Sequence, residues 1–167
     1  MGTDEKMKLK MSNTVTVMIF CGVFGLLSLV QAWITYPVTF NIPGVTVATL
    51  SYSETGLKGI SEGAYQPMLV LIAAILALAL VPVELIKKGR TITKAMLMLA
   101  GSLIVVGTTL VLIDVGSFAT NFTIPATETM VAGAVSAGVS LYVIALFGAF
   151  VVVVPALQML GIMPDWE

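Results

Sequence analysis

The residues of this 167-residue chain that could carry out acid–base, redox or metal chemistry are few. The chain has no histidine and a single cysteine, Cys21, so histidine proton relays, bis-histidine haem and the common zinc and copper sites are excluded. Cys21 lies within an apolar run, where we expect it to pack as a small hydrophobic residue. Asp114 lies near the end of another run, where its carboxylate reaches interfacial water; an ion-ligand role is the alternative. The sequence therefore predicts no enzyme, no cofactor and no metal site.

The composition is that of a membrane protein. Hydrophobic residues make up 58% of the chain and charged residues 10%, against about 25% charged residues in a soluble domain. The formal net charge of −1, with no basic face, gives no reason to expect a nucleic acid as partner. The partner that this composition predicts is the lipid bilayer.

Four apolar runs predict an all-α integral membrane protein with a four-helix transmembrane bundle. Each run reaches or exceeds the ~20 residues needed to cross the hydrocarbon layer. A chain of this length forms one membrane domain, 1–167, and is too short for a second domain of any size. Two segments between the runs form loops on one side, at about 36–66 and 116–125. The expected spans are about 13–35, 67–86, 91–115 and 126–160.

The basic residues orient these spans. Seven of the eight lysines and arginines flank one side of the four runs, and only Lys58 falls on the other side. Basic residues beside spans are retained in the cytoplasm, so we expect both termini to be cytoplasmic, in a multi-pass protein of the cell membrane. Glu84 would then pair with Lys88 one helical turn later at the cytoplasmic surface.

The first outer loop carries the pattern of a β-hairpin. Apolar and polar residues alternate over Val38–Ile42, and the β-branched stretch Val45–Ser51 follows. Between them, Pro43-Gly44 supplies the backbone angles of a type II turn. A two-stranded hairpin is marginal by itself in water, so we expect this one to pack on the helix ends or to pair with another chain.

The second outer loop contains one candidate modification site. Asn121-Phe122-Thr123 is an N-glycosylation sequon. Such triplets are frequent by chance. What favours Asn121 as an acceptor is that the charge pattern places this loop outside.

The fourth run opens with small residues that favour close helix packing. Alanines, glycines and serines recur there at a spacing of four, which lets helix backbones approach one another in lipid. We expect this segment to be the most tightly packed helix and the main contact surface; the alternative is that it only seals the protein's own bundle. The residues in question are Gly133, Ser136, Ala137, Gly138 and Ser140.

Four spans, cytoplasmic termini, a long β-forming first outer loop and a short second one together resemble the layout of claudin-like proteins. Trp33 stands at the start of the first outer loop, and Gly56-Leu57 matches the beginning of the family's Gly-Leu-Trp motif. Lys58 replaces the tryptophan of that motif, and the family's two loop cysteines are missing. The resemblance covers the layout of the chain, and it implies assembly side by side and with neighbours through the outer loop.

The function that these patterns favour is structural. We expect a non-enzymatic membrane protein that forms a homo-oligomer, or joins other membrane subunits as an accessory subunit, through the fourth span and the outer hairpin. A membrane enzyme ranks third because the acid–base and metal groups of an active site are missing. The second-ranked function is a small oligomeric channel or transporter, whose path would be lined by the hydroxyl residues Thr108, Thr109, Ser136 and Ser140.

Overall fold

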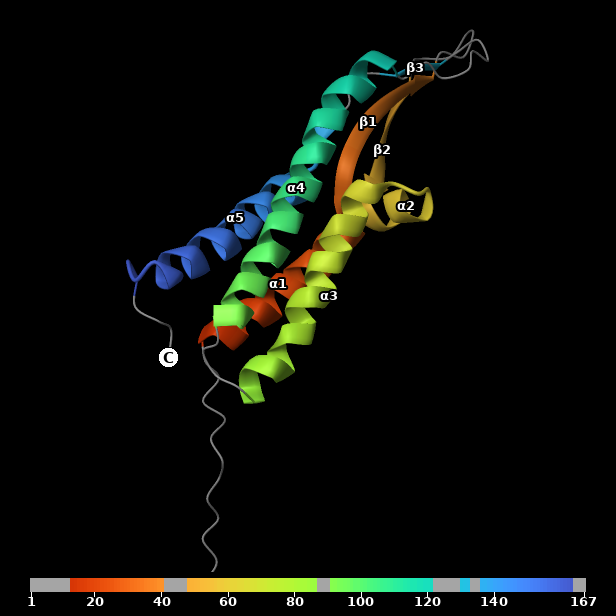
Figure 1. Cartoon of the computed structure of the whole chain (residues 1–167). Coiled ribbons are helices and arrows are strands. Elements are labelled where there is room, and N and C mark those ends of the chain that lie inside the picture. The colour runs from red at the N-terminus through yellow and green to blue at the C-terminus, as the bar shows by residue number, and fades with distance from the viewer. Residues whose placement is uncertain (1–12, 41–47, 87–90, 122–129, 133–135, 164–167) are drawn as a thin grey trace, which may run out of the picture.

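Four long apolar helices and a small antiparallel sheet make up the protein (Figure 1), in a computed structural model that describes residues 13–40, 48–86, 91–121, 130–132 and 136–163. Each long helix has the length and apolar composition to cross a membrane, α4 over Thr91–Val115. The structure thus confirms the predicted fold class. The helices are α1 (Asn13–Val30), α3 (Tyr65–Ile86), α4 (Thr91–Asn121) and α5 (Val139–Met159).

Backbone hydrogen bonding explains why these apolar runs are helical. In hydrocarbon, every N–H and C=O needs a partner within the protein, and a helix supplies one for each residue between its ends. Pro67 lies in the first turn of α3, where its missing N–H costs no bond. Pro82 in α3 and Pro155 in α5 each remove one helical bond, and each lies within the last two turns of its helix.

Glycines close three of the seams between neighbouring helices. A Cβ on Gly101 of α4 would lie 2.8 Å from the carbonyl oxygen of Gly148 on α5, so the two backbones touch there. Gly25 of α1 and Gly107 of α4 each pack closely on α3. Such contacts matter because lipid tails give little hydrophobic drive to bring helices together.

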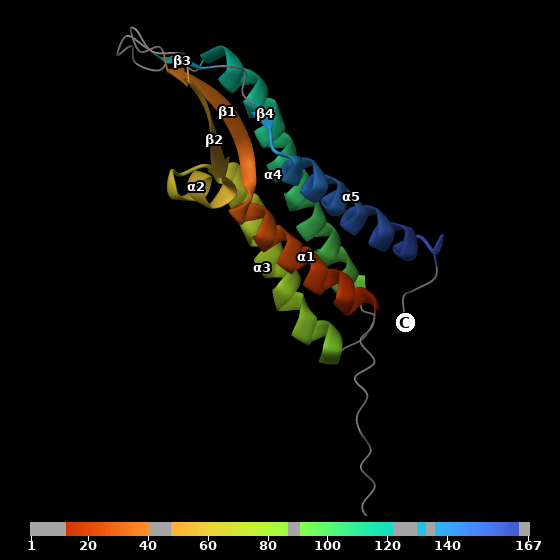
Figure 2. The same ribbon diagram turned by 180° about the vertical axis from the view of Figure 1, so that it is seen from behind.

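The fourth seam, between α1 and α5, is much looser. α1 packs mainly on α3, α3 on α4 and α4 on α5, whereas α1 and α5 touch over a smaller area. Figure 2 shows α4 through the space between α1 and α5. The apolar core that the helices share includes the fully buried side chains of Met18, Val70, Ile104, Leu141 and Val151.

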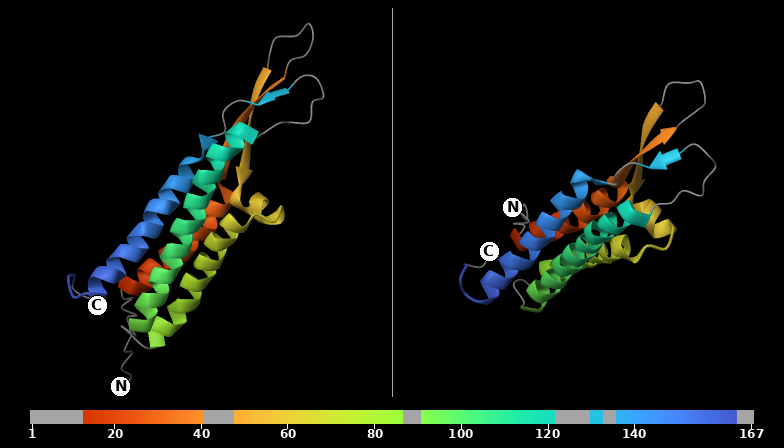
Figure 3. Two further views of the ribbon diagram at one scale, coloured as in Figure 1. Left: turned by 45° about the horizontal axis from the view of Figure 1, so that its top comes forward. Right: turned by 90° about the horizontal axis from the view of Figure 1, so that it is seen from above.

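The sheet stands at one end of the bundle, which we call the sheet end; the opposite end is the far end (Figure 3). Its strands are β1 (Ala32–Phe40), β2 (Ala48–Thr55), β3 (Met130–Ala132) and β4 (Ser136–Ala137). β2 pairs with one side of β1, while β3 and β4 both pair with the other side, all antiparallel.

The predicted hairpin is therefore present, as β1 and β2. Its strands extend further from the turn than expected, since pairing continues from Phe40 and Ala48 to Ala32 and Thr55. The predicted turn, Pro43-Gly44, lies outside the described residues. The second connection adds β3 and β4 to the same sheet, which the sequence pattern did not predict.

Two predicted span boundaries and the start of one predicted loop were wrong, whereas the third span, predicted at about 91–115, agrees with the apolar part of α4. α1 ends at Val30 and not near 35, because the aromatic and β-branched residues that follow favour a strand and pair with β2. α4 continues as a helix to Asn121, so the segment 116–121 is not a loop. α5 begins at Val139 and not near 126, because residues of β3 and β4 pair with β1.

A short helix, α2 (Gly56–Ser61), joins the sheet to α3. Thr55 caps its start, since the Thr55 hydroxyl accepts a hydrogen bond from the Lys58 backbone N–H at 3.2 Å. α2 packs on α3 and on β2 at the sheet end. The base of the hairpin is thus fixed to the bundle on this side.

Replacing Gly101 by alanine tests the contact between α4 and α5. In an open helix this change stabilises by up to ~1 kcal/mol. Here the new Cβ would meet the Gly148 carbonyl, and we expect the opposite sign, a loss of ~1–3 kcal/mol. Thermal unfolding in detergent measures it. Leu99→Phe, which adds volume on the exposed side of α4, should change the melting temperature little; equal melting temperatures for the two variants would contradict the expectation.

Candidate functional site

Hydrogen bonds at the sheet end join the corner between α1 and β1 to the corner between β4 and α5. The Gly138 N–H donates to the Trp33 carbonyl at 2.8 Å, and the Ser140 hydroxyl donates to the Ala32 carbonyl at 2.7 Å. A Cβ on Gly138 would lie 2.0 Å from the Ala32 carbonyl oxygen, a distance that no side chain tolerates. We call this contact the corner junction. It accepts only glycine at position 138.

Trp33 is the aromatic anchor of the corner junction. Its side chain is 3% exposed, and its Nε1–H donates to the Ser28 carbonyl at 2.7 Å. The β1–β2 register shifts between Ala32 and Ile34, and such an irregularity re-aims the side chain at that point. Trp33 therefore packs in the core of the protein and seals the end of α1.

The structure places the predicted small-residue face differently from the sequence interpretation. Ser136 and Ala137 form β4, and Gly138 precedes α5 with an extended backbone. The prediction of a continuous helical face through these residues was wrong, because they supply backbone partners to β1. Ser140 is helical, in the first turn of α5, and Gly133 lies outside the described residues.

Three of the predicted small residues, Gly138, Ser140 and Ser136, lie at the corner junction or beside it. Gly138 and Ser140 bond to the start of β1, and the Ser136 hydroxyl donates to the Thr35 carbonyl at 3.2 Å. Their small size serves strand pairing and a close backbone crossing. Asn121 is the last residue of α4; the rest of its sequon lies outside the described residues, so glycosylation stays a prediction.

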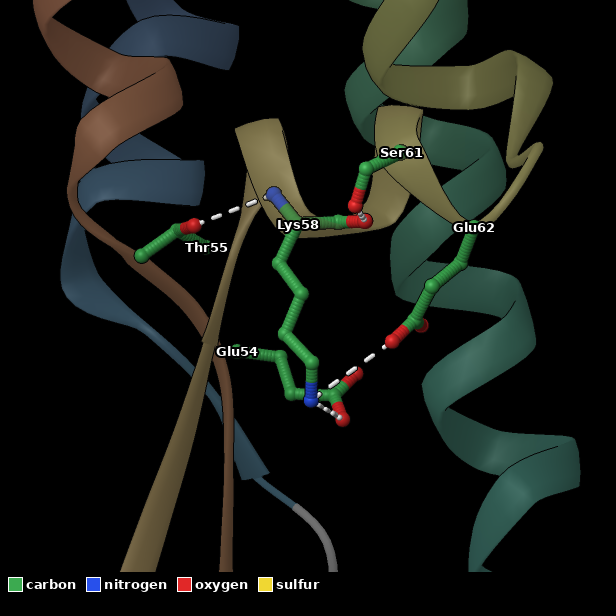
Figure 4. A network of polar contacts seen from close by, with 5 residues as sticks. All are labelled: Glu54, Thr55, Lys58, Ser61 and Glu62. Atoms are coloured by element: carbon green, nitrogen blue, oxygen red, sulfur yellow. Dashed lines mark hydrogen bonds and ion pairs between the residues drawn. The ribbon is translucent and has the colours of Figure 1, made fainter.

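A network of charged side chains covers α2 (Figure 4). The Lys58 ammonium lies 2.8 Å from a Glu54 carboxylate oxygen and 3.7 Å from one of Glu62. The Lys58 and Glu62 side chains are exposed and that of Glu54 is part-buried, and surface pairs of this kind contribute about 0–1 kcal/mol. The spacing of four in Glu54, Lys58 and Glu62 was the sequence signal for this network, which the sequence analysis did not use.

A cavity of about 140 Å³ opens beside this network, between α2 and the sheet-end halves of α3 and α4. Glu54, Glu62, Gln66 and Asp114 contribute polar groups to its wall. The Gln66 amide donates a hydrogen bond to the Asp114 carboxylate across the α3–α4 seam. Within the described ranges, no group of three or more acidic or cysteine side chains is arranged to hold a metal ion.

Among the polar side chains buried at the far end are two charged ones and one amide that the sequence analysis placed at the surface or did not consider. Glu84 of α3 is 2% exposed, Lys94 of α4 8% and Gln158 of α5 7%. Each of the three has an interaction partner, as buried charge in a membrane protein requires. Glu84 is therefore not a surface carboxylate; Lys88, its expected partner, lies outside the described residues.

The hydroxyl residues considered for a transport path do not converge. Thr108 is fully buried, and its hydroxyl bonds to the Ile104 carbonyl of its own helix at 2.8 Å. Thr109 is exposed on another side of α4. Ser136 and Ser140 bond to backbone carbonyls at the α1–β1 corner, as described above. In the described part of the chain, Thr108, Thr109 and the pair of serines thus lie in three different surroundings.

No protein-family model matches the chain, and no curated protein is significantly similar to it. Information on its function therefore has to come from its own structure. At the sheet end, that structure consists of strand pairing, a backbone crossing at the corner junction and surface ion pairs.

Replacing Gly138 by alanine tests the corner junction. The new Cβ cannot coexist with the Ala32 carbonyl, so the ends of α1 and α5 must separate, and we expect a loss of at least ~1–3 kcal/mol of stability. Val139→Leu is the matched control because Val139, the next residue, is 77% exposed. Thermal unfolding of both variants in the same detergent provides the comparison. If Gly138→Ala melts with the control, the corner junction is not a close contact.

Proposed function

We propose that this protein is a structural membrane protein that assembles with copies of itself, or with other membrane subunits, through its sheet. The observation that carries the proposal is the open edge of β2. Among the described residues, β2 pairs with β1 alone, while β1 has strands on both sides. An unpaired strand edge is a template for a strand of another chain. Assembly through an outer loop is also what the claudin-like layout implies.

The edge of β2 lacks the features that usually protect such strands. Natural edges are blunted with proline, lysine, short length or a covering element. β2 runs over eight residues, ATLSYSET, with neither proline nor lysine. α2 touches β2 only near its base, since it follows directly after Thr55. The proposed partner strand therefore adds to β2 by backbone hydrogen bonds, the mode known as β-augmentation.

The backbone direction of β2 follows from β1. Successive residues of a strand direct their N–H and C=O groups to opposite sides. The Thr35 carbonyl accepts from Ser136, so Thr35 and, two residues on, Pro37 face β3 and β4. Pro37, which has no N–H to donate, falls between the β3 and β4 pairings. Ser51 lies opposite Pro37, so its N–H faces the open edge of β2.

The orientation of the protein is part of the proposal. We infer that the sheet end is outside, that both termini are cytoplasmic and that the protein belongs to the cell membrane. Lys94, beside the predicted basic turn 87–90, lies at the far end, and Lys58 at the sheet end is the exception to the charge pattern. Retention of basic residues in the cytoplasm supports this direction.

Proline at position 51 tests assembly through β2. Ser51→Pro removes one N–H from the open edge and leaves the pairing with β1 intact, so we expect smaller oligomers at an unchanged melting temperature. Tyr52→Pro removes an N–H that faces β1 and should lower the melting temperature by itself. Mass measurement of the native complex in mild detergent, with Ser51→Ala as control, distinguishes them. Equal masses for Ser51→Pro and Ser51→Ala would reject the β2 edge as the assembly surface.

Cysteine labelling tests the orientation. In a Cys21→Ala background, a cysteine at Ser53 should react with an impermeant thiol reagent added outside cells. A cysteine at Gly89 should react only after the membrane is permeabilised. The reverse pattern would invert the proposed orientation and would leave the assembly proposal to be judged on its own experiment.

A further inference from the structure

The loose seam between α1 and α5 contains a hollow that is larger than the cavity beside α2. It is a groove of about 370 Å³, within the range of roughly 300–1,000 Å³ typical of ligand sites, in the sheet-end halves of both helices. We call it the α1–α5 groove. Its walls include Leu27 and Ser28 of α1, Gln31 directly after α1, and Ser140, Val143 and Ile144 of α5.

The α1–α5 groove is closed at both ends. Towards the far end, the rings of Phe24 and Phe147 meet across the seam, with centroids 5.7 Å apart. Towards the sheet, the Ser140 hydroxyl holds the Ala32 carbonyl at the corner junction. From Phe24 to Gln31 the helix rises about 10 Å. The groove is therefore a short, bounded slot that opens sideways, between two helices that can each cross a membrane.

The lining of the slot becomes more polar from the far end towards the sheet end. At the Phe24–Phe147 end, its lining is aromatic and aliphatic, whereas Gln31 and Ser140 stand at the sheet end. None of its described lining residues is charged. The Gln31 amide can both donate and accept hydrogen bonds. An occupant that matches this wall has a hydrocarbon part towards the far end and uncharged oxygen atoms at the sheet end.

The lining of the slot favours a hydrocarbon chain over a protein helix. Helices dock in membranes through small residues that let backbones approach, and this wall is built largely of leucine, valine, isoleucine and phenylalanine. We propose that the α1–α5 groove binds one hydrocarbon chain of a membrane lipid, whose glycerol-level oxygen atoms hydrogen-bond to Gln31.

Filling the slot with a tryptophan side chain tests this lipid site. The protein, stripped of lipid in dodecyl maltoside, is titrated with palmitoyl-oleoyl phosphatidylcholine, and bound lipids are counted by native mass spectrometry. Val143→Trp places a large ring in the slot and should lose one bound lipid. Leu146→Trp is the matched control, because Leu146 lies on the same helix, is 74% exposed and does not line the groove. It should bind lipid as the unaltered protein does.

Two results would overturn the proposal. In the first, Val143→Trp retains every lipid that Leu146→Trp retains. In the second, Val143→Trp lowers the oligomer mass with an unchanged lipid count, which would make the groove a contact between subunits.

Should Val143→Trp fail to fold, Gln31→Leu decides the matter, because Gln31 is exposed and no core packing depends on it. The loss of a neutral hydrogen bond should weaken lipid binding roughly threefold to tenfold. Unchanged binding by Gln31→Leu would reject the site. The result does not depend on assembly through β2, so either proposal can fail alone.

Discussion

Close approach of backbones is the constraint on which the rest of the structure depends. Moving an apolar side chain from lipid into a helix contact gains no hydrophobic free energy, so helices stay together only where their surfaces touch over many atoms. Gly25, Gly101 and Gly107 permit this on three seams. On the fourth seam, between α1 and α5, the close backbone contact lies outside the helices, at Gly138 in the corner junction. The α1–α5 seam is consequently closed by the corner junction at its sheet end and contains the α1–α5 groove next to it.

The sheet is rigidly attached because β1 continues almost directly from α1. One residue, Gln31, separates α1 from β1, and Trp33 fixes the bend between them from inside the core. β3 and β4 brace the other side of β1 from the second connection. A small sheet of this kind would be marginal by itself. Anchored in this way, it can present a free edge without losing its shape.

The sequence was sufficient for the helices and the hairpin, and insufficient for the corner junction. Apolar length predicts spans because each span meets the same physical requirement, whatever its neighbours. Alternation over Val38–Ile42 predicts a strand for a similar local reason. The stretch around Gly138 carries no such local signal, since small residues suit a close helix crossing and a close strand pair equally. Its structure is decided by β1, about a hundred residues earlier in the chain.

The burial of Glu84 and Lys94 was missed for the same reason. Their positions near the ends of spans suggested contact with water, and only the packing of α3, α4 and α5 excludes solvent from them.

The distance along the chain between β1 and its second set of partners also affects how the protein is made. Ser136 bonds to a residue 101 positions earlier, and Ser140 to one 108 positions earlier. During synthesis, β1 and β2 leave the ribosome long before β3, β4 and α5 exist. Until then, one side of β1 is unpaired, and the α1–α5 groove has no wall on the side of α5. Long-range pairings of this kind form late, and exposed strand edges are prone to wrong pairing in the interval. The strands that cover the second side of β1 are therefore made long after β1 itself.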